Sequence, residues 1–163
     1  MQYNNSSKKN IPEEKILDKI VKYCTYRERC TYEVEEKLKS WTSTSTAIKS
    51  AIDFLIKERF LNEERYVKLF VKSKLNQNWG VRKITSHLKQ KRVDSALIES
   101  AFADYTTDFH AEKLQTLAQK KWSSLKEVDI KKKTEKTIRY LISRGFELDS
   151  VFKEVKKLPQ KPL

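Results

Sequence analysis

The chain has 163 residues with a formal net charge of +13; 35% of its residues are charged and only two are glycine. A β-sandwich or β-barrel needs Gly- and Pro-containing turns about every 8–12 residues, and a phosphate-binding loop needs clustered glycines, so composition excludes these folds and sites. Lys, Glu, Leu and Ala are abundant and are good helix formers, which predicts an all-α protein.

The N-terminal part predicts a polar tail followed by three helices. Residues 1–11 lack an apolar stretch, so we expect a disordered tail without a signal peptide. A first helix should begin near Pro12, where proline suits a first turn, and end near Tyr26. A short second helix capped by Thr31 and a third helix beyond a Ser/Thr-rich loop complete a first repeat, residues 12–60.

The middle part, residues 61–106, predicts a second set of three helices. Asn62 is a good N-cap, and acidic residues follow it in the first turn, where the helix dipole favours negative charge. The expected apolar arc of this helix is Tyr66, Leu69, Phe70 and Val71. Trp79–Gly80 breaks the helix, and two shorter helices follow. Their expected apolar residues are Val81, Ile84 and Leu88, then Ile98, Phe102 and Tyr105.

The last part, residues 107–158, predicts a third set. A long helix is followed by a looser stretch near Ser123–Asp129 and by a helix carrying Leu141. Gly145 stands where a residue of positive φ ends a helix, with the next apolar side chain folding back on it. Pro159 stops the final helix, and residues 159–163 form a tail.

The three passes superpose without gaps on three leucines, Leu38, Leu88 and Leu141. Ten, fourteen and seventeen residues after each leucine comes an apolar residue. These residues are Ile48, Ile52 and Leu55, then Ile98, Phe102 and Tyr105, then Val151, Val155 and Leu158. Such spacing is one helix face. We therefore expect three tandem three-helix units of about 50 residues, each too small to be stable alone, in an elongated, curved repeat array.

Positive charge is concentrated in residues 65–92, which contain nine basic and no acidic side chains. Such a stretch favours a polyanion-facing surface, although a merely solvated basic face is the alternative. Trp79 lies in the turn between two basic helices, where it could stack on a base or plug the core beneath the turn. The candidate binding residues are Arg65, Lys68, Lys72, Lys74, Trp79, Arg82, Lys83, Lys89, Lys91 and Arg92. A second basic surface is expected at Lys131, Lys132, Lys133, Lys136 and Arg139.

Enzyme chemistry has little support in this sequence. Neither His87 nor His110 has a nucleophile beside it, and no carboxylate cluster suggests a metal nuclease. Cys24 and Cys30 lack the spacing of a zinc site and are expected to be reduced thiols. No run approaches the length of a membrane span. We therefore expect no catalytic residues, no metal, no cofactor and a cytoplasmic location.

Five segments carry a family resemblance across residues 13–158. The three segments in the middle of the chain read Phe60-Leu-Asn-Glu-Glu-Arg-Tyr-Val-Lys-Leu-Phe-Val-Lys-Ser-Lys-Leu, then Trp79-Gly-Val-Arg-Lys-Ile, then His87-Leu-Lys-Gln-Lys. Together with Glu33-Val-Glu-Glu-Lys-Leu and Tyr140-Leu-Ile-Ser-Arg-Gly-Phe, they resemble the RecX family of recombinase regulators in order and spacing. The chain departs from the family pattern at Val34 and at Val67. It also departs at Lys91–Arg92, where the family usually has a glycine.

The resemblance implies a function as well as a fold. Members of this family lie in the groove of the filament that RecA forms on single-stranded DNA, and they lower its ATP hydrolysis and strand exchange. The resemblance thus implies the RecA filament and single-stranded DNA as partners, and it leaves open whether the protein also binds double-stranded DNA. It further implies a monomer that does not bind a membrane. The alternative is a sequence-independent nucleic-acid-binding helical module without a protein partner, which would bind DNA with strong salt dependence.

Overall fold

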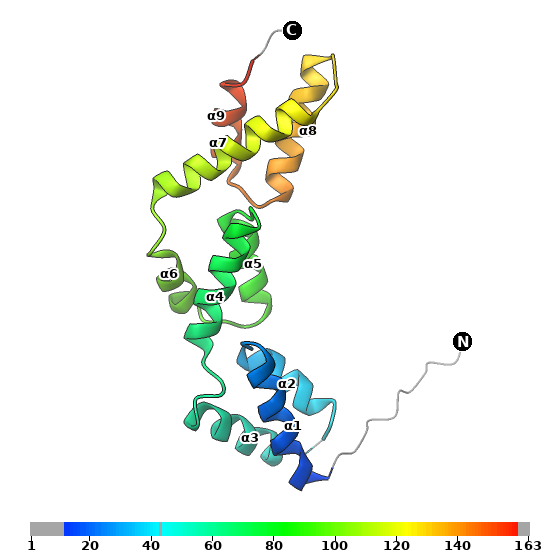
Figure 1. The fold of residues 1–163 in the computed structure, drawn as a ribbon, viewed down its shortest axis with the longest axis vertical. Coiled ribbons are helices and arrows are strands. Elements are labelled where there is room, and N and C mark those ends of the chain that lie inside the picture. Colours follow the sequence, from blue (N-terminus) through cyan, green and yellow to red (C-terminus); the bar gives the residue numbers. More distant parts are fainter. Residues whose placement is uncertain (1–11, 43, 160–163) are drawn as a thin grey trace, which may run out of the picture. The chain divides into compact units, whose positions relative to one another are not determined.

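The computed structural model describes residues 12–42 and 44–159, and this part contains α-helices and no strands (Figure 1). The all-α prediction is confirmed. The tail predicted for residues 1–11, and residues 160–163 of the C-terminal tail, lie outside the described residues. The helices are α1 (Glu13–Tyr26), α2 (Thr31–Lys39), α3 (Ser45–Lys57), α4 (Glu63–Asn76), α5 (Val81–Gln90), α6 (Ser95–Phe102), α7 (Thr107–Ser124), α8 (Ile130–Ser143) and α9 (Leu148–Lys156).

By packing, the chain divides into two compact units. Unit 1 runs up to Val67 and also includes Lys91–Val93, whereas unit 2 comprises Lys68–Gln90 and the chain from Asp94 onward. The boundary passes through α4, so it does not coincide with the repeat boundaries expected after residues 60 and 106. The three repeats at those bounds stay a prediction.

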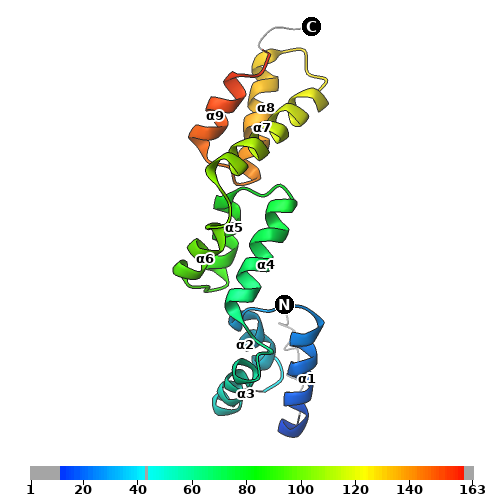
Figure 2. The same ribbon diagram turned by 60° about the vertical axis from the view of Figure 1, so that its left-hand side comes forward.

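The core of unit 1 lies between α1, α2 and α3, which pack on one another (Figure 2). Ile20, Val34 and Leu55 are fully buried there, and Trp41 is partly buried against them. Cys24 and Cys30 are buried free thiols, as expected. Burial raises the pKa of the Cys24 thiol to about 11, so this thiol stays protonated at neutral pH.

In unit 2 the largest core lies between α7, α8 and α9, which contact one another pairwise. Leu114, Trp122, Leu141 and Val151 are buried in it, which places Trp122 as a structural residue. A smaller set of buried residues, including Ile84, Leu88 and Ile98, lies on α5 and α6.

The three anchor leucines of the predicted repeat occupy matching places. Leu38, Leu88 and Leu141 are each 0% exposed, and the next helix begins seven residues after each of them. Their predicted burial is confirmed. This common spacing between each leucine and the start of the next helix explains why the sequence superposes without gaps.

Helix ends follow the local sequence signals closely. Gly145 has φ 89°, and the amide of Phe146 donates to the Leu141 carbonyl while that of Gly145 donates to Ile142, which is a Schellman motif. The same pattern ends α4, where Asn78 has φ 59° and the Trp79 amide donates to Lys74. Asn78 takes this backbone because its short polar side chain tolerates the left-handed region.

At the start of α4, the Asn62 side chain accepts from the Arg65 amide at 2.8 Å, so the predicted N-cap is confirmed.

Four local predictions were wrong. Thr31 is the first residue of α2, not its cap, and its hydroxyl donates to Glu63 instead. Leu69 is 50% exposed, because the buried face of α4 runs through Val67 and Val71. Tyr105 and Leu158 lie just beyond α6 and α9, since helix ends are the least reliable feature of a periodic pattern.

The chain's only two glycines lie against each other in unit 2. The Gly80 amide donates to the Arg144 carbonyl at 2.7 Å, and the Arg82 amide donates to the Gly145 carbonyl at 3.2 Å. A methyl group on Gly80 would collide with the backbone of Gly145 and Phe146. This contact joins the α4–α5 turn to the α8–α9 turn and requires a residue without Cβ.

Side chains reinforce this junction. The Arg144 guanidinium donates to the carbonyls of Gln77 and Asn78, the second at 3.1 Å, and the Lys83 ammonium donates to the Ser143 carbonyl at 3.2 Å. Lys113 of α7 donates to the Leu75 carbonyl at 2.7 Å. The exposed carbonyls at the end of α4 are therefore satisfied by cations from α7 and α8.

Leu88→Ala should lower the free energy of unfolding by about 2–5 kcal/mol, because it leaves a cavity in a fully buried position. Leu69→Ala is the matched control on an exposed leucine and should change it by less than about 1 kcal/mol. Urea unfolding followed by circular dichroism measures both. Equal effects of the two substitutions would show that the burial of Leu88 is assigned wrongly.

Gly80→Ala should destabilise the protein by about 1–3 kcal/mol, because the added methyl forces two backbone turns apart. Ser86→Ala, an exposed change on α5, should stay within about 0.5 kcal/mol. The same urea titration applies. An unfolding free energy unchanged by Gly80→Ala would mean that the two turns do not touch in solution.

Candidate functional site

The ten predicted binding residues divide between the two units. Arg65, Lys91 and Arg92 belong to unit 1, and the other seven belong to unit 2. The sequence from Arg65 to Arg92 contains no acidic residue, and it supplies the cations of both groups.

In unit 1 the predicted cations are matched by partners. Lys91 Nζ lies 2.5 Å from Glu33 Oε1, and Glu33 is only 13% exposed. Arg65 Nε lies 2.6 Å from Glu28 Oε1. The Arg92 guanidinium carbon lies 5.0 Å from the centroid of the Tyr32 ring, a cation–π distance. The charges of Lys91 and Arg65 therefore have carboxylate neighbours within the fold.

Glu33 is the centre of a charge network that sequence reasoning missed. Besides Lys91, the guanidiniums of Arg27 and Arg29 lie 3.8 and 3.9 Å from its two oxygens. Arg29 is itself 9% exposed and covers the Tyr23 ring at 3.9 Å. The run of glutamates that begins at Glu33 predicts a solvated first turn. Glu33 is instead nearly buried, because the chain that leaves α5 places Lys91 against it.

In unit 2 Trp79 is surrounded by cations. The ammonium groups of Lys74 and Lys83 lie 4.9 and 4.5 Å from its ring centroid, and the His87 ring lies at 4.8 Å. Trp79 is partly buried. Since the indole already contacts three side chains, it holds two lysines at the α4–α5 turn.

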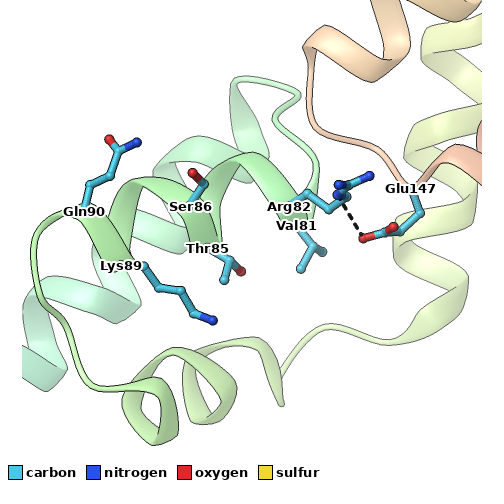
Figure 3. A pocket seen from close by; sticks show the side chains of 7 residues that line it. All are labelled: Val81, Arg82, Thr85, Ser86, Lys89, Gln90 and Glu147. Atoms are coloured by element: carbon cyan, nitrogen blue, oxygen red, sulfur yellow. Dashed lines mark ion pairs between the residues drawn. The ribbon is translucent and has the colours of Figure 1, made fainter.

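The outer face of α5 is a shallow cationic hollow (Figure 3). Arg82, Ser86 and Lys89 line this face beside the Val81–Ile84–Leu88 stripe, as predicted from helical spacing. Glu147 closes one end, with its Oε1 3.8 Å from Arg82 Nε. Both partners are more than half exposed, so the pair is weak and screened by salt.

Lys68 and Lys72 are exposed on α4, one helical turn apart. The second basic surface lies on α8, where Lys131, Lys132, Lys136 and Arg139 are exposed. Lys136 pairs with Glu127, and Lys133 lies over the Trp122 ring at 5.1 Å. Both basic surfaces of unit 2 are thus exposed, and both include cations that contact their own unit.

A second hollow, not foreseen from the sequence, adjoins α5. It has a volume of about 370 Å³, and its apolar wall consists of Ile98, Phe102, Tyr105 and His110. Burial first and the charge of Lys113 second lower the pKa of His110, which favours the neutral form of its imidazole. Periodicity predicts Phe102 and Tyr105 on the apolar face of their helix, and a surface or partly buried His110 near a helix start. The three rings come together where the chain turns from α6 into α7.

Among the residues that the structure describes, no group of three or more His, Cys, Asp or Glu side chains could hold a metal ion. Within the same residues, no helix is both long and apolar enough to cross a membrane.

Comparison with known proteins gives consistent matches. The family model described as RecX, second three-helix domain, matches residues 62–101, and the model for the third three-helix domain matches residues 108–153. A Vibrio parahaemolyticus protein named Regulatory protein RecX is 29% identical over 144 residues, which are 88% of this chain and 92% of that protein. A Vibrio campbellii protein of the same name is 32% identical over 125 residues, 77% and 79% of the two chains.

Solved structures agree. The crystal structure of RecX from Lactobacillus salivarius has a TM-score of 0.76 and 27% sequence identity, over 90% of this chain and 96% of that one. The sequence resemblance and the three-helix organisation predicted from it are confirmed by these matches.

Reversing two charges on α4, Lys68→Glu with Lys72→Glu, should weaken binding to single-stranded DNA at least tenfold without unfolding the protein. The slope of log affinity against log salt should also fall, by about 0.7 for each phosphate that the protein no longer neutralises. Fluorescence anisotropy at several salt concentrations measures both. Lys49→Glu with Lys57→Glu, on exposed lysines of α3, is the matched control. Equal weakening in the two variants would mean that DNA binding depends on the net charge of the protein and not on the position of Lys68 and Lys72.

Lys91→Ala should behave differently. It removes a partner of the nearly buried Glu33, so we expect the free energy of unfolding to fall by about 1–3 kcal/mol. Urea unfolding checks this. Lys72→Ala, at an exposed position, should leave stability within about 0.5 kcal/mol. A fully stable Lys91→Ala variant with weakened DNA binding would move Lys91 to the binding surface.

Proposed function

Because this chain belongs to the RecX family of regulatory proteins, we propose that it binds the filament of RecA on single-stranded DNA and lowers RecA's ATPase and strand-exchange activities. The single observation that carries the proposal is the family match across the second and third three-helix domains. The protein acts as a binder and not as an enzyme, in the cytoplasm, where RecA and DNA are found.

The charge distribution supports a polyanionic partner. The cations on the outer faces of α4 and α5 in unit 2, Lys68, Lys72, Arg82 and Lys89, lie on helices without an acidic residue after Glu64. A nucleoprotein filament presents phosphates and a regular protein surface together. Cations attract the filament and orient the encounter, while contacts with the protein subunits supply specificity.

Binding at several places explains how a small protein without an active site can inhibit. Each exposed cationic group contributes little alone, but groups on α4, α5 and α8 belong to one chain, so the second contact forms at high effective concentration. A chain held in this way opposes the changes that RecA subunits make during ATP turnover. We therefore assign the primary contact to α4 and α5 and an extending contact to Lys131, Lys132 and Arg139 of α8.

The test is RecA ATPase activity on single-stranded DNA, titrated with this protein in the presence of a large excess of that DNA. We expect ATP hydrolysis to fall and to remain low as DNA is added, because the target is the filament. The variant carrying Lys68→Glu and Lys72→Glu should inhibit at least tenfold less well, and the Lys49→Glu, Lys57→Glu control should inhibit normally.

Relief of inhibition by excess DNA would contradict the proposal. It would mean that the protein only competes for DNA, as a nucleic-acid-binding module without a protein partner does. No effect on ATPase at any concentration, with DNA binding intact, leads to the same conclusion.

A further inference from the structure

The two hollows beside α5 share part of their wall. Val81, Thr85 and Lys89 line both the cationic hollow and the aromatic one. Lys89 therefore stands on the ridge between a cationic and an apolar compartment. Arg82 lies on the same helix face, seven residues and about 10 Å along the axis from it.

The aromatic hollow has open ring surface within its wall. The Phe102 and Tyr105 rings lie 6.3 and 6.4 Å from the His110 ring, tilted at 60° and 46° to it. These three side chains are each only partly buried. The Phe109 ring contacts the Tyr105 ring, with 5.3 Å between their centroids. At about 370 Å³ the hollow falls in the range of about 300–1,000 Å³ typical of small-molecule sites.

We propose that the aromatic hollow receives an unstacked base of single-stranded nucleic acid, while Arg82 and Lys89 hold the phosphates on either side of that base. The inference rests on the proposed function in one respect, that single-stranded DNA is a ligand, and it names the site and the part of the strand recognised. Single-strand binders combine cations along the backbone with aromatic side chains on which bases stack.

Charge complementarity favours this occupant. Arg82 and Lys89 line the cationic hollow, and Ser86 and Thr85 add hydroxyl donors beside them. His110 lines the aromatic hollow beside Phe102 and Tyr105, and its lowered pKa favours the uncharged ring. Glu99 on the rim of the aromatic hollow repels phosphate but accepts hydrogen bonds from the N–H groups of a base. Paired bases are stacked inside the duplex, so double-stranded DNA offers no base to the hollow.

The experiment compares three DNA ligands in the absence of RecA. Full-length protein is titrated by fluorescence anisotropy against oligo(dT), an abasic strand of the same length and charge, and a duplex. The unchanged protein should bind oligo(dT) at least fivefold more tightly than the abasic strand. Tyr105→Ala should abolish that ratio while leaving affinity for the abasic strand unchanged. Tyr105→Phe, which keeps the ring, should retain it.

Tyr26→Ala is the matched control, because Tyr26 is 85% exposed in unit 1 and lines neither hollow. A second measurement needs no substitution. The imidazole NMR signals of His110 should shift with oligo(dT) and not with the abasic strand. This readout keeps the test valid even if Tyr105→Ala unfolds.

Equal affinity for the oligo(dT) and abasic strands, with unmoved His110 signals, would overturn the proposal. If Tyr105→Ala then still weakens RecA inhibition, the hollow takes a side chain of RecA and not a base. Failure of the proposed function looks different, since the oligonucleotide assay contains no RecA: the ATPase test would fail while base preference persists.

Discussion

The contact between Gly80 and Gly145 is the constraint on which unit 2 depends. Two turns from different three-helix domains approach so closely that backbone donates to backbone, and only residues without a side chain allow it. Because of this contact, α4–α6 residues and α7–α9 share one compact unit. It also fixes α5, whose first turn is held at its N-terminus by the Gly145 carbonyl.

Fixing α5 has consequences for the proposed binding, because α5 carries on its outer side two of the cations that we propose as binding residues. Arg82 and Lys89 project from a helix that is anchored at its start by the glycine contact and buried along Ile84 and Leu88. Such a rigid element holds the backbone positions of the two cations fixed when they meet phosphate. In contrast, Lys91 and Arg65 are held by Glu33 and Glu28 and contribute to the stability of unit 1.

Local features could be predicted from the sequence, and long-range ones could not. The Leu38, Leu88 and Leu141 anchors and the Gly145 helix end follow from periodicity and backbone sterics, which act over a few residues. The pairing of Gly80 with Gly145, 65 positions apart, depends on how three-helix domains dock. The Lys91–Glu33 pair, 58 positions apart, likewise depends on contacts between residues distant in the sequence. The predicted burial of Leu69 was wrong because the short apolar arc of α4 is compatible with more than one buried face of the helix.

Amide hydrogen exchange of the unmodified protein tests the central claim, that the two glycine turns form one structural unit, most directly. The Arg82 amide lies in the first turn of α5, where amides have no intrahelical partner, so its protection reports the bond to Gly145 alone. The account predicts that the Gly80 and Arg82 amides exchange as slowly as those of Ile84 and Leu88, in a single cooperative opening. Fast exchange at Gly80 and Arg82, with slow exchange at Ile84 and Leu88, would contradict it.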